Sequence, residues 1–167
     1  MFRVLLSLAK SFIALAPAAQ ADEFPLRKPG LWEIATSLGD AAPQIARYCI
    51  DAETEARMRA VGEGHMAGFC SRRDVQRSGD LVTTDSVCRV GPSLVTSHAV
   101  TTLTGDAAYS TVTTFHYDPP TQTGVADTKT SQEAKWLGPC GADMQPGDMM
   151  IQGQKFHLPE MMEGEHH

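Results

Sequence analysis

Methionine and histidine residues gather near the end of this chain, and both side chains can bind copper. Thioether sulfur suits reduced copper, and imidazole nitrogen suits the oxidised ion. The candidate ligands within residues 144–167 are Met144, Met149, Met150, His157, Met161 and Met162. The segment has no Met-x-x-Met repeat and no ladder of histidines, and methionine also fills irregular gaps in a core. We therefore expect no cofactor and keep copper as the alternative.

Common catalytic motifs are absent from the sequence. It has neither the Gly-x-Ser-x-Gly turn of many hydrolases nor the His-Glu-x-x-His helix of many zinc enzymes. Asp85, Ser86 and either His98 or His116 have the residue types of a catalytic triad, but a chain of this size contains many such combinations. We expect no enzyme activity and keep a small hydrolase as a second alternative.

The two tryptophans of the chain, Trp32 and Trp136, are candidates for ligand stacking. An exposed indole offers a flat surface for a sugar or an aromatic ligand. A buried indole packs the core instead, as large apolar side chains usually do. Because the first and last strands can pair, the two indoles are expected to lie near each other, and both interpretations stay open.

The four cysteines, Cys49, Cys70, Cys88 and Cys140, are the most informative residues in the chain. They form no Cys-x-x-Cys motif of the kind found in thiol oxidoreductases, and their spacing does not match a zinc site. An even number of cysteines in a small exported chain is typical of a disulfide framework. We expect these cysteines to be structural rather than reactive.

Residues 1–21 indicate export. A basic start at Arg3 leads into an apolar stretch, and Ala19-Gln20-Ala21 has the small residues that a signal peptidase recognises. This segment carries two basic side chains and no acidic one, so its removal changes the formal charge from −6 to −8. An acidic chain is a poor partner for nucleic acid, and no later segment has the ~20 apolar residues that span a bilayer. We expect a periplasmic protein with no nucleic-acid partner and no membrane span.

Alternating apolar residues and turn signals predict a mainly β fold. The expected strands are 31–36, 44–50, 71–77, 81–90, 93–104, 107–117 and 124–136. Asp51 is the expected N-cap of a short helix that includes 54–60. Three glycines, Gly62, Gly64 and Gly68, predict a flexible loop after this helix.

These elements predict a curved antiparallel meander or half-open barrel of six to seven strands with one short helix. The signal peptide occupies residues 1–21, and the disulfide-stapled β domain occupies residues 22–143. A C-terminal tail that contains the methionines and histidines follows over residues 144–167. It is rich in Gly, Pro and Met without a clear period, which predicts irregular structure with a short closing element.

The turn at Gly105-Asp106 determines which side chains of the flanking strands share a face. A two-residue turn places Thr104 opposite Ala107. Since side chains alternate along a strand, His98 and His116 then point to opposite faces of the sheet. A metal site built from these two histidines is therefore not expected.

Strand direction narrows the three ways in which four cysteines can pair. Cys70 and Cys88 flank a hairpin that turns at Ser78-Gly79-Asp80, so its strands bring them opposite each other. In a simple meander, Cys140 ends far from Cys88. If the sheet curls until the last strand meets the first, Cys140 arrives beside Cys49. We therefore expect the pairs Cys70–Cys88 and Cys49–Cys140.

Two segments resemble those of a known family. Lys28-Pro29-Gly30-Leu31-Trp32-Glu33 stands just after the signal, and Trp136-Leu137-Gly138-Pro139-Cys140 stands at the close. Together with the order of the cysteines, they are similar to a family of small exported proteins of Gram-negative bacteria, catalogued only as a domain of unknown function. The resemblance covers nearly the whole chain after the signal. It implies a secreted β-rich domain and supplies no activity and no catalytic residue.

Function follows from these expectations in outline only. We expect a non-catalytic periplasmic binding or envelope-support module. A curved sheet that closes on a helix can leave a cleft, so the expected partner is an unknown apolar ligand or an envelope protein. The alternatives are a periplasmic copper-binding protein that uses the Met/His tail, and a small hydrolase.

Overall fold

The structure is a computed structural model that describes residues 24–158. Within this range the chain forms one antiparallel sheet and one helix, which confirms the mainly β prediction, but the sheet has nine strands rather than six or seven. The strands are β1 (Gly30–Leu38), β2 (Gln44–Ile50), β3 (Cys70–Ser78), β4 (Leu81–Val90), β5 (Ser93–Thr104), β6 (Ala108–Asp118), β7 (Asp127–Gly138), β8 (Asp148–Ile151) and β9 (Gln154–His157). The helix is α1 (Ala52–Phe69). The expected signal peptide lies outside the described residues.

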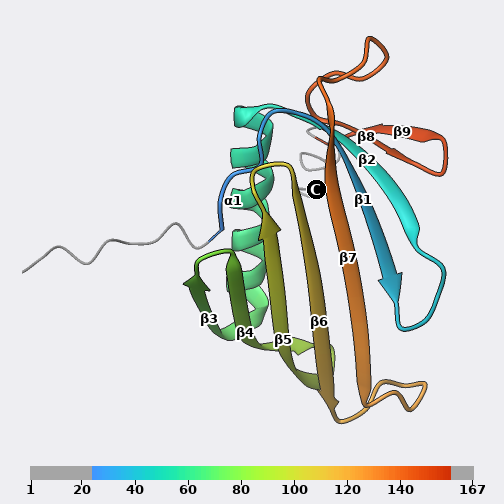
Figure 1. Cartoon of the computed structure of the whole chain (residues 1–167). Coiled ribbons are helices and arrows are strands. Elements are labelled where there is room, and N and C mark those ends of the chain that lie inside the picture. Colours follow the sequence, from blue (N-terminus) through green and yellow to red (C-terminus); the bar gives the residue numbers. More distant parts are fainter. Residues whose placement is uncertain (1–23, 159–167) are drawn as a thin grey trace, which may run out of the picture.

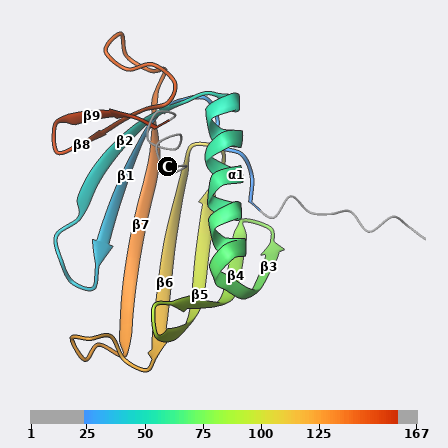
Figure 2. The same cartoon turned by 180° about the vertical axis from the view of Figure 1, so that it is seen from behind.

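The sheet is curved and open. Its strands are ordered β3-β4-β5-β6-β7-β1-β2-β8-β9, so β3 and β9 form its edges and it does not close into a barrel. The long strands curve past the helix, which lies behind them in Figure 1 and in front of them in Figure 2. We call the face toward α1 the inner face and the opposite face the outer face.

The pairing of β1 with β7 joins the early and late parts of the chain. Trp32 lies opposite Trp136, and Ile34 lies opposite Ala134. The prediction that the sheet curls until the strand near residue 136 meets the first strand is therefore confirmed. The core gathers at this seam on the inner face. It consists of Trp32, Ile34, Ile50 and Ala134, packed with Tyr48, Met58, Tyr109 and Trp136.

The helix is longer than the sequence predicts. Asp51 is its N-cap, as expected, and its Oδ1 accepts a hydrogen bond from the backbone N–H of Thr54 at 2.7 Å. This hydrogen bond holds the pKa of Asp51 below its ordinary value. The helix then continues well beyond the predicted residues 54–60 and ends at Phe69.

The loop predicted at the three glycines is wrong, because the helix runs through Gly62, Gly64 and Gly68. A Cβ at any of them would meet open space, so no close contact requires glycine there. Each glycine weakens a helix by only about 1 kcal/mol relative to alanine. The cap at Asp51 and the disulfide at Cys70, which directly follows the helix, fix both ends and offset that loss.

Residues 148–157 form a hairpin where the sequence predicts an irregular tail. β8 pairs with β2, and β9 pairs with β8, so the first part of the tail belongs to the same sheet as the β domain. The turn is Gln152-Gly153, and both residues have a positive φ. Glutamine seldom adopts this conformation, so the turn lacks the Asn-Gly or Asp-Gly signature that marks hairpins in a sequence.

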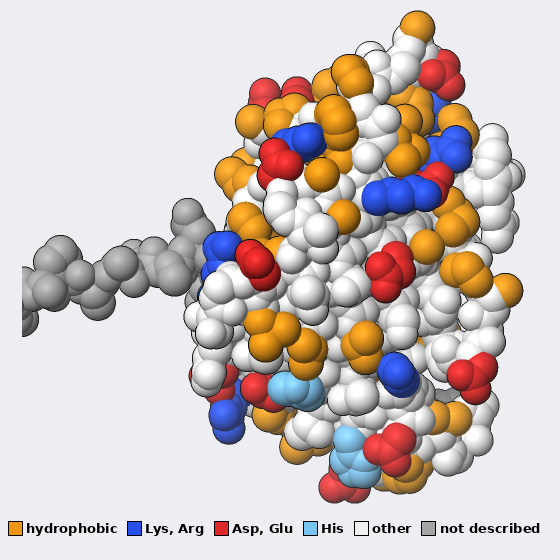
Figure 3. Space-filling model, in the orientation of Figure 1, with side chains coloured by type: hydrophobic (Ala, Val, Ile, Leu, Met, Phe, Trp, Pro, Cys, Tyr) orange, Lys and Arg blue, Asp and Glu red, His pale blue; other side chains and the backbone are white. Residues whose placement is uncertain are grey.

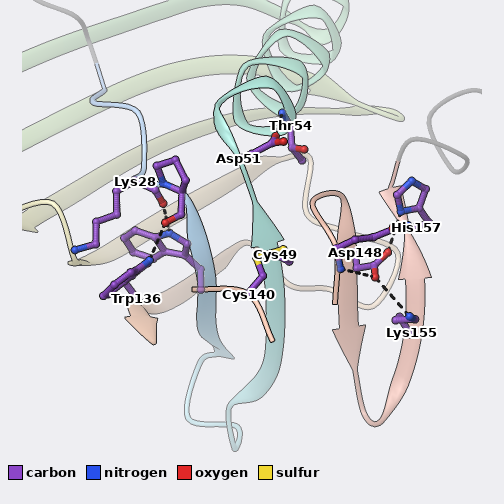
Figure 4. The surroundings of a disulfide bond; sticks show 12 residues. Lys28, Cys49, Asp51, Thr54, Trp136, Cys140, Asp148, Lys155 and His157 are labelled. Atoms are coloured by element: carbon purple, nitrogen blue, oxygen red, sulfur yellow. Dashed lines mark hydrogen bonds and ion pairs between the residues drawn. A yellow bond between two sulfur atoms is a disulfide. The ribbon is translucent and has the colours of Figure 1, made fainter. Parts of the chain in front are cut away.

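Both disulfides have the pairing that strand direction predicts. Cys49 in β2 is bonded to Cys140, which follows β7, over a separation of 91 residues (Figure 4). Cys70 at the start of β3 is bonded to Cys88, its partner in the register with β4. No cysteine is left free. Two disulfides in so small a protein are typical of an oxidising, extracytoplasmic environment.

Candidate functional site

The tryptophans lie at the β1–β7 seam, where the segment before β1 holds both. Trp32 is 1% exposed, and its Nε1 donates to the carbonyl of Lys28 at 2.9 Å. Trp136 is half-buried, and its Nε1 donates to the carbonyl of Pro29 at 3.0 Å (Figure 4). The Lys28 ammonium lies 3.8 Å from the ring centroid of Trp136. Trp32 is therefore enclosed in the core and offers no surface for stacking, while Lys28 covers one face of Trp136.

A buried ion pair ties the same N-terminal segment to α1. Arg27 Nη2 and Glu55 Oε2 are 2.6 Å apart, and the two side chains are 13% and 7% exposed. Burial opposes the charge of Arg27, but the hydrogen bond and the negative charge of Glu55 outweigh it and raise the pKa of Arg27. Burial also raises the pKa of Tyr48 and Tyr109 beside it. No spacing rule predicts this pair, because its partners are 28 residues apart.

Three candidate copper ligands lie in or next to the closing hairpin. Met144 and Met149 are 7% and 9% exposed and pack as core residues. Met149 and Met150 are successive residues of β8, so their side chains point to opposite faces. The bond geometry of a strand therefore separates two of the expected ligands.

The remaining candidate ligand in the described residues, His157, is bonded to a buried carboxylate. Its Nδ1 lies 2.9 Å from Asp148 Oδ1, and the backbone N–H of Gln145 donates to Asp148 Oδ2 at 3.0 Å (Figure 4). Met161 and Met162 lie outside the described residues. Within residues 24–158, no group of three or more His, Cys, Asp or Glu side chains is arranged to hold a metal ion.

The predicted register of β5 and β6 is wrong by one residue. Thr104 pairs with Ala108 rather than with Ala107, because three residues form the turn instead of two. This shift moves every side chain of β6 to the other face relative to β5. His98 and His116 therefore share the outer face.

Each outer-face histidine is paired with an aspartate of a neighbouring strand. His98 Nδ1 lies 2.8 Å from Asp85 Oδ1, and His116 Nδ1 lies 2.9 Å from Asp127 Oδ1. Figure 3 shows the outer face, with two separate histidine patches, each beside an acidic side chain. Ser86 points to the inner face, opposite to its neighbour Asp85. The residues that resemble a triad in the sequence therefore do not meet.

An open groove of about 390 Å³ lies between the last turns of α1 and the inner face of β4, β5 and β6. We call it the apolar groove. Its side chains come from four elements, and the Cys70–Cys88 disulfide forms part of its wall. The residues that shape it are Met66, Phe69, Val90, Val95, Phe115 and Tyr117.

The lining of the apolar groove is almost free of charge. Arg89 is the charged residue among those that line it, and the strand register places its side chain on the outer face, opposite Leu94. At the floor, the hydroxyls of Ser86 and Ser97 bond to each other at 2.7 Å. Two other surface cavities, of about 480 and 620 Å³, have charged side chains in their lining. The apolar groove is thus the cavity suited to an uncharged hydrocarbon group.

Sequence reasoning did not find the apolar groove, although the signal was present. Val95, Phe115 and Tyr117 alternate with polar residues along β5 and β6. The two-residue turn places Val95 on the opposite face from Phe115 and Tyr117. With the observed register, these three side chains share the inner face.

No helix within residues 24–158 is long and apolar enough to cross a membrane. No curated protein matches the chain, and no solved structure does. A family model described as "Protein of unknown function (DUF3617)" matches residues 27–140, which include α1, all of β1–β7 except its edges and all four cysteines. This match covers more than half of the sequence. The chain therefore belongs to the DUF3617 family of proteins of unknown function.

Proposed function

We propose that this protein is a non-catalytic periplasmic binding module that holds an apolar ligand in the apolar groove. The observation that carries the proposal is a concave cavity of about 390 Å³ lined mainly by apolar side chains. Ligand sites in proteins are typically concave, mostly apolar and about 300–1,000 Å³ in volume. The volume and the chemistry of the apolar groove both agree with that class of site.

Exposed apolar side chains at the rim support the proposal. Phe69 is 61% exposed and Val90 is 56% exposed, and both line the apolar groove. Large side chains that cluster at a cavity while exposed to water indicate a surface that gains free energy when it is covered. The Ser86–Ser97 pair satisfies its own hydrogen bonds, so an apolar ligand can cover this floor without leaving a polar group unpaired.

The periplasmic location rests on two supports. The two disulfides favour an oxidising compartment outside the cytoplasm. Residues 1–21 have the pattern of a cleavable signal peptide in the sequence. Mass spectrometry of the protein recovered from a periplasmic extract should give a chain that starts at Asp22, and an uncleaved chain in the cytoplasm would contradict this location.

A neutral fluorescent probe tests the binding proposal. N-phenyl-1-naphthylamine should give saturable fluorescence with the protein without residues 1–21. Val90→Asp places a charge at the rim and should weaken probe binding at least about tenfold, since a desolvated charge is costly. Leu38→Asp, at a site that is 62% exposed and outside the apolar groove, is the matched control and should leave binding unchanged. The absence of saturable binding, or equal losses in both variants, would overturn the proposal.

A further inference from the structure

A second cavity adjoins the apolar groove on the other side of the end of α1. Its volume is about 620 Å³, and its lining includes Phe24, Arg59, Glu63 and Arg73. Met66 and Cys70 line both cavities. The two cavities therefore share a wall, and a ligand that extends past Met66 reaches from one into the other. Methionine is the most adaptable apolar side chain, which suits a wall that such a ligand crosses.

The second cavity differs from the apolar groove in its charge. It carries two arginines and one acidic residue, in a protein whose formal net charge is −6. We call it the basic cavity. Arg59 Nη1 donates to the carbonyl of Phe24 at 2.7 Å, which fixes the position of its guanidinium. Arg73 lies opposite Ser86 in the register of β3 with β4, so it extends from the inner face, where the apolar groove also lies.

We propose that the occupant is a single-chain anionic amphiphile. Its hydrocarbon chain lies in the apolar groove, and its carboxylate or phosphate head lies in the basic cavity near Arg59 and Arg73. This inference rests on the proposed function and adds the class of ligand. The charge distribution carries it, because an uncharged groove favours hydrocarbon while a guanidinium favours a planar or tetrahedral anion.

The arrangement favours one chain rather than a bilayer surface. The two cavities meet at an angle around the end of α1 and have separate linings apart from Met66 and Cys70. A bilayer surface would instead meet a broad patch that combines exposed apolar side chains with a cluster of cations. Arg72, next to Arg73, points to the outer face and is paired with Asp74, so it contributes no cation to such a patch.

Competition against the neutral probe tests the inference with three ligands of equal chain length, all below their micelle concentrations. Dodecanoate and dodecyl phosphate should displace the probe at lower concentration than dodecyltrimethylammonium. The expected preference is about fivefold, which is the upper range for one solvent-exposed charge pair. Comparison of the two anions distinguishes a fatty-acid head from a phosphate head.

Arg73→Gln should remove the preference for the anions while the neutral probe still binds, which shows that the variant is folded. Arg72→Gln is the matched control, since this neighbouring arginine lies on the other face, and it should keep the preference. Equal affinity for all three ligands, or a preference that survives in Arg73→Gln, would overturn the inference while the apolar groove keeps its proposed role. If no ligand displaces a probe that does bind, the inference fails; if the probe itself does not bind, the proposed function fails with it. Sedimentation of the protein with phosphatidylglycerol vesicles, without extraction of the dodecanoate-like chains, would identify a membrane surface instead and contradict the single-chain ligand.

Discussion

Gly30 begins β1 with a φ of +135°, and its hydrogen atom occupies space that no other side chain could use. A Cβ at this position would lie 2.3 Å from Nε1 of Trp136 and 2.4 Å from the carbonyl oxygen of Gly138. The neighbours of Gly30 in the sequence hold the same place, since the carbonyls of Lys28 and Pro29 accept hydrogen bonds from the two indoles. The segment that resembles a family motif is therefore a clasp on the β1–β7 seam.

Gly30→Ala should lower the free energy of unfolding by about 2–4 kcal/mol, because it combines backbone strain with displacement of the Trp136 ring. Urea denaturation followed by tryptophan fluorescence measures this loss. Gly39→Ala is the matched control, since Gly39 also has a positive φ but a Cβ there meets open space. The control should lose only about 1–2 kcal/mol. Equal losses would show that contact with Trp136 is not what requires glycine.

Asp148 should make the closing hairpin sensitive to acid. Burial alone would raise its pKa, but hydrogen bonds from the Gln145 N–H and from His157, with the charge of Lys155, hold the pKa below its ordinary value. A carboxylate with a lowered pKa in the folded state stabilises the fold above its unfolded pKa of about 3.9. That contribution is lost as the pH falls through the lower folded value.

Asp148→Asn should therefore unfold at a lower urea concentration than the natural protein at neutral pH. It should also lose less stability than the natural protein as the pH is lowered to about 2, because the group that titrates is absent. Urea midpoints measured over this pH range give the comparison. Parallel pH curves for the two proteins would contradict the role assigned to the Asp148 carboxylate.

At the scale of the element, α1 offers a test of why the sequence is misleading. Gly64 lies inside the helix, is exposed, and leaves room for a Cβ. Gly64→Ala should raise the free energy of unfolding by about 0.5–1 kcal/mol. Gly64→Pro should lower it by about 3 kcal/mol, because proline removes a backbone hydrogen bond of the helix. Thermal unfolding that tolerates the proline would show that residue 64 belongs to a loop.

Strand positions could be predicted from the sequence more reliably than strand registers. The residues of β2, β4 and β5 match their predicted bounds, because alternating apolar residues and glycine turns mark them. The register of β6 could not be predicted, since it depends on whether Ala107 belongs to the turn or to the strand. Both assignments satisfy the same turn chemistry at Gly105-Asp106. The inner-face cluster that forms the apolar groove depends on that single residue.

At the scale of the whole molecule, the two disulfides differ in how much chain they constrain. They span 91 and 18 residues. In the chain-entropy model, loops of these lengths correspond to about 4.6 and about 3.2 kcal/mol of stabilisation. Removing Cys49–Cys140 should therefore destabilise the protein more than removing Cys70–Cys88. Paired serine replacements and guanidinium denaturation measure both losses, and a larger loss for the short loop would contradict this order.

The disulfide pairing could be predicted because it depends only on strand direction and on the curl of the sheet. The candidate site could not be predicted in the same way. The apolar groove needs the last turns of α1, which carry Met66 and Phe69, and the three glycines conceal those turns in the sequence. The closing hairpin also stayed hidden, because the positive φ of Gln152 has no sequence signature.

The nesting of Cys70–Cys88 inside Cys49–Cys140 has a consequence for biosynthesis. Cysteines leave a translocation channel in chain order, so Cys49 and Cys70 meet an oxidant long before Cys140 does. An oxidant that joins thiols in order of appearance would link Cys49 to Cys70 and leave both native partners unpaired. Correct pairing then requires either that oxidation wait until β7 has docked on β1, or that a thiolate attack the early bond and exchange it. We expect the yield of native protein to depend on a disulfide isomerase rather than on an oxidase alone.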